Sequence, residues 1–212
     1  MKLDIKIEIP ESINDIKLWH WQKYMSIVKE DADVEFANRK ALEIFYGIDG
    51  KHYTKLKVKD IDKIVSVLSD ALREKPTLVT RFVLNDIEYG FIPDFDDMTF
   101  GEFVDLDKYS NIKDYHKLMS ILFRPIINDS KGKYAIASYE GSNELLKDMP
   151  LGITLSATAF FLTIALQLTR GILKSSMVTE PILKQKQDLV LSGLGILQST
   201  PLPMEAYLNL KM

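Results

Sequence analysis

The sequence contains no cysteine, and this absence excludes several kinds of protein at once. Without thiols, the chain cannot form a disulfide scaffold, a thiolate zinc site or a cysteine nucleophile. A chain without disulfides is typical of a reducing compartment. With 212 residues, of which 46% are hydrophobic and 27% charged, it is long enough to bury a core without cross-links or metal. The composition therefore predicts a globular protein that is stabilised by apolar packing.

Catalytic and metal-binding patterns are missing as well. The three histidines, His20, His52 and His116, are too scattered to form a recognisable metal pair. No H-E-x-x-H, G-x-S-x-G or P-loop motif is present. We therefore predict a protein that is not an enzyme and that uses no cofactor and no metal. The net charge of −3 provides no overall basic field, so sequence-specific binding to nucleic acid is not expected either.

A continuous apolar segment is absent from the first residues, so we expect no secretory signal. Residues 2–9 instead alternate between charged and apolar side chains, which predicts a half-buried strand that Pro10 ends. Apolar residues at helical spacing then predict three amphipathic helices, over residues 15–29, 31–46 and 60–73.

Turn and cap residues mark the middle of the chain. Asn85 and Asp86 both tolerate positive φ and predict a two-residue hairpin turn. Thr99 and Glu102 have the spacing of a capping box, which predicts that a helix begins there. These signals and the apolar runs around them predict strands over 78–84, 87–92 and 134–139 and helices over 99–109 and 113–123, the latter ending before Arg124-Pro125.

Charge is missing from the 21 residues between Asp148 and Arg170. As a straight helix this run would span roughly 32 Å, about the thickness of the hydrocarbon core of a bilayer. Its small and polar residues fall in one stripe, which favours contact with protein over insertion into lipid. We therefore expect a helix over about 150–175 that packs in protein or between subunits, with a membrane span as the less favoured alternative. The stripe contains Gly152, Ser156, Ala159, Thr163 and Gln167 and continues beyond the uncharged run into Arg170 and Lys174.

The expected fold class is α+β, mainly helical, with an N-terminal strand, a small antiparallel hairpin and a long apolar C-terminal helix. A change in composition divides the chain into an α+β domain over 1–142 and a helical region over 143–195. The helical region should contain a further helix over about 181–191. Pro201 and Pro203 predict that residues 196–212 form an extended arm.

Two charged clusters stand out. The densest group of carboxylates could hold a hard cation, but it lacks the pattern of a calcium-binding loop. We favour a solvated loop whose charges stabilise the N-terminus of the helix that follows. A group of lysines around Tyr53 could touch a nucleic-acid backbone, although a solvated face is the preferred interpretation. The two clusters are Asp94, Asp96, Asp97, Glu102, Asp105 and Asp107, and Lys51, Lys55, Lys57 and Lys59.

Large aromatic residues near the N-terminus are the strongest candidates for contact with a partner. Trp21 fits the inner face of its helix, whereas Trp19 points to another face. Aromatic residues left at a surface often anchor interfaces, but both indoles could also line one core. Together with the polar stripe, this reasoning gives the predicted interface residues Trp19, Trp21, Tyr24, Ser156, Thr163 and Gln167.

Short motifs follow one another along the chain in a recognisable order. They are Ile9-Pro10-Glu11-Ser12, Phe91-Ile92-Pro93-Asp94, Gly101-Glu102-Phe103-Val104-Asp105-Leu106, Leu122-Phe123-Arg124-Pro125-Ile126 and the segment from Tyr134 to Gly141. Over roughly residues 5–170 the chain resembles uncharacterised structural-region proteins of tailed phages that infect Bacteroides-type gut bacteria, the crAss-like phages among them. The resemblance implies a component of the capsid–tail apparatus or a factor that helps to build it. It carries over no catalytic residues.

The resemblance implies a non-enzymatic virion structural protein, in a neck or tail ring or as capsid cargo. Such a protein would bind copies of itself and other phage structural proteins, and it would be assembled in the host cytoplasm and reside in the virion. Two alternatives stay open at this point. One is a tail-assembly chaperone that is absent from the mature particle, and the other is a membrane-active protein that is ejected with the genome.

Overall fold

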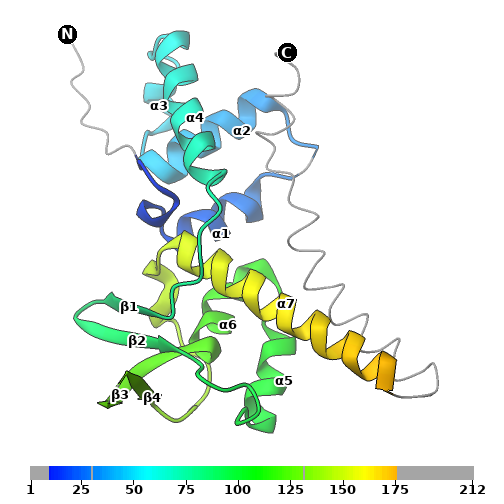
Figure 1. Ribbon diagram of the computed structural model, residues 1–212. Helices are drawn as coiled ribbons and strands as arrows, with labels where there is room; N and C mark the ends of the chain where they lie inside the picture. Colours follow the sequence, from blue (N-terminus) through cyan, green and yellow to red (C-terminus); the bar gives the residue numbers. More distant parts are fainter. Residues whose placement is uncertain (1–9, 30, 131, 176–212) are drawn as a thin grey trace.

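Helices and one antiparallel sheet make up the structure (Figure 1). The computed structural model describes residues 10–29, 31–130 and 132–175, with side chains as far as residue 164. The described part of the chain is a mixture of helix and strand. Its elements are η1 (Ile13–Asp15), α1 (Leu18–Ile27), α2 (Val34–Tyr46), α3 (Gly50–Tyr53), α4 (Val58–Leu72), β1 (Arg81–Leu84), β2 (Ile87–Phe91), α5 (Phe100–Lys108), η2 (Ile112–Asp114), α6 (Tyr115–Leu122), β3 (Phe123–Ser130), β4 (Lys133–Ile136), η3 (Leu145–Asp148) and α7 (Leu151–Ser175), where η marks a 3-10 helix.

The amphipathic helices α2 and α4 lie toward one end of the molecule, away from the sheet, and α1 lies between α2 and the start of α7 (Figure 1). Asp33 caps α2 by accepting a hydrogen bond from Phe36 N at 3.1 Å, and Gly47 ends it with a φ of 65°. The inner face of α4 is apolar and buried, as its periodicity requires. The three helices predicted from periodicity are therefore confirmed. The short α3 is not predicted, because Asp49-Gly50 is typical of a turn.

The sheet is a meander in which β1, β2, β3 and β4 pair in sequence order. Asn85 and Asp86 have φ of 51° and 62°, so the hairpin turn predicted between β1 and β2 is confirmed. Aromatic rings gather on the buried face of the sheet, with neighbouring centroids 5.1 to 5.4 Å apart. This layer, which closes one side of the core, consists of Phe82, Tyr89, Phe91 and Phe123.

Strand β3 is the strand that the sequence does not predict. The helix expected over 113–123 forms as η2 and α6, and the chain enters β3 directly at Phe123. Pro125 disfavours helical backbone at the residue before it, which favours extended chain here. Although proline cannot donate to the ladder, its carbonyl accepts a hydrogen bond from Ala137 N at 2.9 Å. The pairing of β3 with β4 then shifts register between Ile126 and Asn128, a bulge of the kind near which sheets tolerate proline.

The start of α7 belongs to the same core as the N-terminal helices. Leu151 N donates to Ile16 O, and Leu18 N donates to Met149 O, both at 2.8 Å. Leu146, Met149 and Leu151 are each at most 1% exposed. The apolar core thus crosses residue 143, and the domain boundary predicted there stays a prediction.

Three predicted segments lie outside the described residues: the strand over 2–9, the helix over 181–191 and the arm over 196–212. Helix α7 occupies Leu151–Ser175. In the part of the chain that the structure describes, no helix has both the length and the hydropathy that a membrane crossing requires.

Gly90 on β2 provides a test of the packing on the open face of the sheet. A Cβ atom at this position would lie 2.5 Å from the ring of Tyr134 and 3.0 Å from Ile126 Cγ1. The ring is held in place because its hydroxyl donates to Phe91 O at 2.7 Å and Arg81 lies over its face at 4.5 Å. We expect Gly90→Ala to lower the free energy of unfolding by about 1–3 kcal/mol, measured by urea denaturation.

Gly101→Ala is the matched control for this experiment. The nearest atom to its added Cβ would be Thr99 Oγ1, at 4.0 Å. Alanine is a better helix former than glycine, so this change should be neutral or should stabilise the protein by up to about 1 kcal/mol. Equal stability of the two variants would contradict the close packing at Gly90.

Candidate interaction surface

The predicted aromatic contacts lie mostly inside the chain's own core. Trp21 is 5% exposed and Tyr24 is fully buried. Their ring centroids lie 6.1 Å from Tyr115 and 5.4 Å from Phe45, respectively. Burial also raises the pKa of the Tyr24 hydroxyl to about 12. The alternative interpretation, in which the aromatic residues line one core, therefore describes both residues, while Trp19 is only partly buried and keeps some surface for a partner.

The small and polar stripe of α7 has a buried half and an exposed half. Gly152 lies so close to η1 that a Cβ atom there would come within 2.8 Å of Ile13 Cγ2. Ser156 is 5% exposed, and its hydroxyl donates to Ile153 O at 3.0 Å. Thr163 is exposed, and its hydroxyl donates to a backbone carbonyl of its own helix at 2.7 Å. The first half of the stripe thus serves a close contact within the chain. Gln167 lies beyond the residues whose side chains are described.

An exposed apolar surface lies on α5, where the sequence does not point to one. Phe100 is 82% exposed, Phe103 54% and Val104 44%. A spacing of three and four residues places these side chains on one side of the helix, and together they form the aromatic face of α5. Exposed aromatic side chains that gather in this way mark interaction sites more often than ordinary surface.

Contacts on the opposite side of α5 hold the helix in place. Thr99 Oγ1 accepts from Glu102 N at 3.3 Å and Glu102 Oε2 accepts from Thr99 N at 2.6 Å, so the predicted capping box is confirmed. Glu102 is 2% exposed, and its Oε1 lies 2.7 Å from Arg124 Nη1 of β3. The Tyr139 hydroxyl donates to Asp105 Oδ2 at 2.6 Å. These contacts fix the aromatic face relative to the sheet.

Carboxylates lie close in sequence to the aromatic face. Asp94, Asp96 and Asp97 precede α5 and Asp107 lies on it, and these four exposed residues form the acidic rim. None of them is in an ion pair with another residue of the described chain. The neighbouring cation, Lys108, lies over the ring of Tyr109 at 4.9 Å. Among the described residues, no three His, Asp or Glu side chains are grouped so that they could hold a metal ion.

The predicted lysine cluster runs from α3 through the connecting segment to the start of α4, at the end of the molecule away from α5 (Figure 1). Its four lysines are all exposed and form no ion pair within the described chain. Val58 lies among them and is 74% exposed. The lysine ridge, as this surface is named below, consists of Lys51, Lys55, Lys57 and Lys59.

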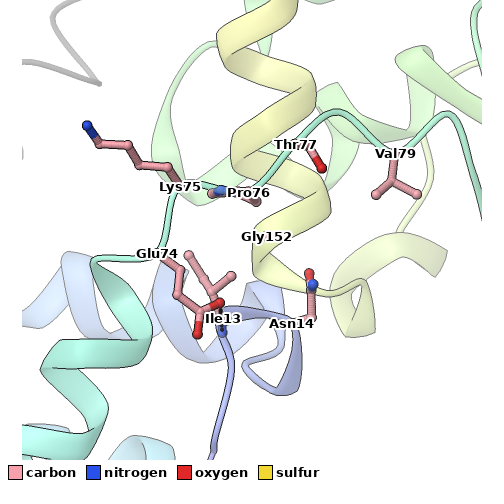
Figure 2. Close-up of a pocket in the computed structure, with 8 residues that line it drawn as sticks. All are labelled: Ile13, Asn14, Glu74, Lys75, Pro76, Thr77, Val79 and Gly152. Carbon is pink, nitrogen blue, oxygen red and sulfur yellow. Dashed lines mark hydrogen bonds between the residues drawn. The ribbon is translucent and has the colours of Figure 1, made fainter.

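A hollow of about 370 Å³ lies where η1, the segment after α4 and the start of α7 meet (Figure 2). Glu74 in this hollow accepts hydrogen bonds from the Ser12 hydroxyl at 3.3 Å and from Ile13 N at 3.2 Å. The Glu74 carboxylate is therefore hydrogen-bonded to η1 and to the residue before it, and the Lys75 side chain points away from the hollow (Figure 2). No nucleophile in the lining makes a hydrogen bond to a base. The hollow is a gap at the junction of these elements. Its lining consists of Ile13, Asn14, Glu74, Lys75, Pro76, Thr77, Val79 and Gly152.

A buried histidine joins α1, α6 and η3. Gln22 Nε2 donates to Ile112 O at 2.7 Å and lies 3.1 Å from His116 Nδ1, while His116 Nε2 lies 3.0 Å from Glu144 Oε2. An amide that donates to Nδ1 leaves the proton of the neutral ring on Nε2, where it faces the carboxylate. Burial lowers the pKa of His116 below its ordinary 6.5, although Glu144 acts in the opposite direction. Lys147 first, and His116 second, lower the pKa of the Glu144 carboxyl to about 2.

Stability is expected to fall as the solution is acidified from about pH 7 to about pH 5. Because the pKa of His116 is lower in the folded chain, the unfolded chain takes up this proton first below about pH 6.5, which favours unfolding. Burial also lowers the pKa of His20, which adds to the same slope. In urea denaturation, His116→Gln should show a smaller loss of stability over this range than wild type. His52→Gln, outside this network, is the control, and an unchanged slope in His116→Gln would refute the assignment.

Comparison with protein-family models, with curated proteins and with solved structures found no match for this chain.

Proposed function

We propose that this chain is a non-enzymatic structural protein of a tailed-phage virion, in a neck or tail ring or as capsid cargo, and that it acts through protein–protein contacts. The observation that carries the proposal is the aromatic face of α5. Phe100 and Phe103 are exposed to solvent on a short helix, and burial of such side chains against a partner is strongly favourable. The phage context comes from the resemblance of the short sequence motifs.

The chemistry of the buried polar groups also supports a binding role. Glu102 is paired with Arg124, and His116 lies between Gln22 and Glu144, so both groups join elements of the fold. A catalytic acid or base needs access to a substrate as well as a suitable pKa. These groups instead hold elements of the fold against one another: Glu102 and Arg124 join α5 to β3, and His116 joins α6 to α1 and to the start of η3.

Helix α7 fits the same proposal. Its first turns are buried against the chain's own core, while Ala159, Phe160 and Thr163 are exposed farther along. We propose that the uncharged run over 149–169 packs against protein at both ends. Its N-terminal end contacts the core of the chain itself, and its C-terminal end contacts a neighbouring subunit. The exposed small and polar residues, Ala159 and Thr163, then permit close approach of that neighbour.

Quantitative mass spectrometry of purified particles tests the structural role. A virion component should be present at a fixed ratio to the major capsid protein through successive gradients. Loss of the chain during purification, with abundant chain in the infected cell, would remove this role.

A tail-assembly chaperone is the second candidate. Its specific support is that the aromatic face is uncovered in the single chain, as a surface that binds a partner transiently would be. The same mass spectrometry separates the two roles, because a chaperone would be abundant in infected cells and depleted from particles.

A further inference from the structure

We propose that the aromatic face of α5, with its acidic rim, docks on the lysine ridge of a second copy of this chain. The inference rests on the proposed role as a protein-binding subunit and names the partner of that surface. Both surfaces are formed by described, exposed residues, and none of their charged side chains is in an ion pair within the described chain.

Charge complementarity identifies the occupant. The segment from Asp94 to Lys108 contains six carboxylates and one lysine, and the one buried carboxylate among them, Glu102, is paired with Arg124. The segment from Lys51 to Lys59 contains four lysines and no carboxylate. Complementary potentials of this kind steer association and fix its register.

The side chains match in a second respect. Lysine carries a long aliphatic stem below its ammonium group, so the ridge can cover aromatic rings and still present charge to the acidic rim. An ammonium over a Phe ring adds a cation–π contact. Val58, 74% exposed between Lys57 and Lys59, supplies an apolar contact for Phe100 or Phe103.

Neighbouring carboxylates restrict where the second copy can sit. Beside Val58 lies a hollow of about 680 Å³ whose lining includes Asp33, Glu35 and Asp62. These groups would repel the acidic rim, so the contact must use the lysine side of Val58 and leave the hollow open. The ridge therefore selects an orientation as well as a partner.

The two surfaces are at opposite ends of the molecule (Figure 1). A contact between different surfaces of identical chains is heterologous, and it repeats from copy to copy until a ring closes or a filament forms. One kind of contact is thus sufficient to build a ring of the kind proposed for a neck or tail component.

Charge reversal on each surface tests the contact with the full chain. One variant carries Asp96→Lys, Asp97→Lys and Asp107→Lys, the second carries Lys55→Glu, Lys57→Glu and Lys59→Glu, and the third combines all six changes. Sedimentation velocity over a concentration series gives the association constant, and circular dichroism checks the fold. Each single-surface variant should associate more than about tenfold more weakly than wild type, because like charges then face each other.

The decisive result is whether charge reversal on one surface compensates for charge reversal on the other. The six-fold variant should regain association, and an equal mixture of the two single-surface variants should form mixed assemblies. Wild-type assemblies should also dissociate when salt is raised from ~0.1 to ~1 M, which needs no variant. A wild-type chain that stays monomeric, or a six-fold variant that folds but does not regain association, would overturn the proposal.

This experiment is separate from the test of the proposed function. A chain that is present in purified particles but monomeric and indifferent to salt would refute the docking and leave the structural role standing. A chain that assembles and shows compensation, yet is absent from particles, would refute the structural role and leave the docking standing.

Discussion

Arg124→Met is expected to lower the free energy of unfolding by about 3–5 kcal/mol, the typical cost of leaving a buried charge without its partner. The change removes the only charged neighbour within 4 Å of Glu102 among the described residues, and Glu102 is 2% exposed. Arg124 Nη1 lies 2.7 Å from Glu102 Oε1, between β3 and the first turn of α5. Urea denaturation of both proteins at neutral pH measures the effect.

The double variant Arg124→Met/Glu102→Gln separates the ion pair from packing. Glutamine at this position keeps the capping geometry and removes the charge, so the double variant should be more stable than Arg124→Met alone. Glu102→Gln by itself should cost less than Arg124→Met, because the Arg124 side chain is 13% exposed and can turn toward water. A loss below about 1 kcal/mol in Arg124→Met would mean that the pair does not hold α5.

Phe100→Ser/Phe103→Ser is expected to weaken association with the partner strongly and to leave the isolated fold intact. The two rings are 82% and 54% exposed, so their removal takes little from the core. Aromatic side chains at the centre of an interface typically contribute more than about 1 kcal/mol each, so their joint loss should weaken association at least about tenfold. Size-exclusion chromatography of infected-cell extracts, with the variant in place of wild type, gives the fraction in large assemblies.

Val83→Ser/Ile127→Ser is the matched control. These residues are 66% and 68% exposed, but they lie on β1 and β3 rather than α5. The control should keep the wild-type elution profile. If the control and the α5 variant lost association equally, exposed apolar area in general, and not the aromatic face, would be responsible.

Local signals explain how much of the fold the sequence predicts. The capping box at Thr99 and Glu102 and the positive φ at Asn85 and Asp86 depend on neighbouring residues only, and both are confirmed. The helices α2 and α4 follow from strong periodicity. In contrast, β3 depends on its pairing with β2 and β4, which no local pattern around Pro125 reveals.

The aromatic face shows why the candidate site is harder to predict. On a helical wheel, Phe100 and Val104 each lie about 160° from Glu102 and Phe103 lies about 100° from it, and the hydrophobic effect alone would turn the three apolar residues inward. The structure buries Glu102 instead, because Arg124 from a distant part of the chain neutralises it. The two charged residues meet only in the tertiary structure, so the spacing of residues within α5 cannot predict their contact.

The interface residues predicted on α1 show the opposite case, in which aromatic side chains expected at a surface are buried. Trp21 and Tyr24 find Tyr115 and Phe45 in other helices, so aromatic residues that look excessive for one helix are used by its neighbours. Thr163 and Trp19 keep exposed surface and stay predictions.

The absence of cysteine allows a direct test of the central claim, that protein covers the aromatic face of α5 in the working state. A single thiol introduced by Val104→Cys reports on this face, and Val83→Cys reports on a surface that should stay open. Maleimide labelling rates are compared between the isolated chain and the assembled form from infected cells. We predict that the thiol at position 104 reacts at least about tenfold more slowly in the assembly while the thiol at position 83 reacts equally in both. Equal labelling of position 104 in the two states would contradict the account.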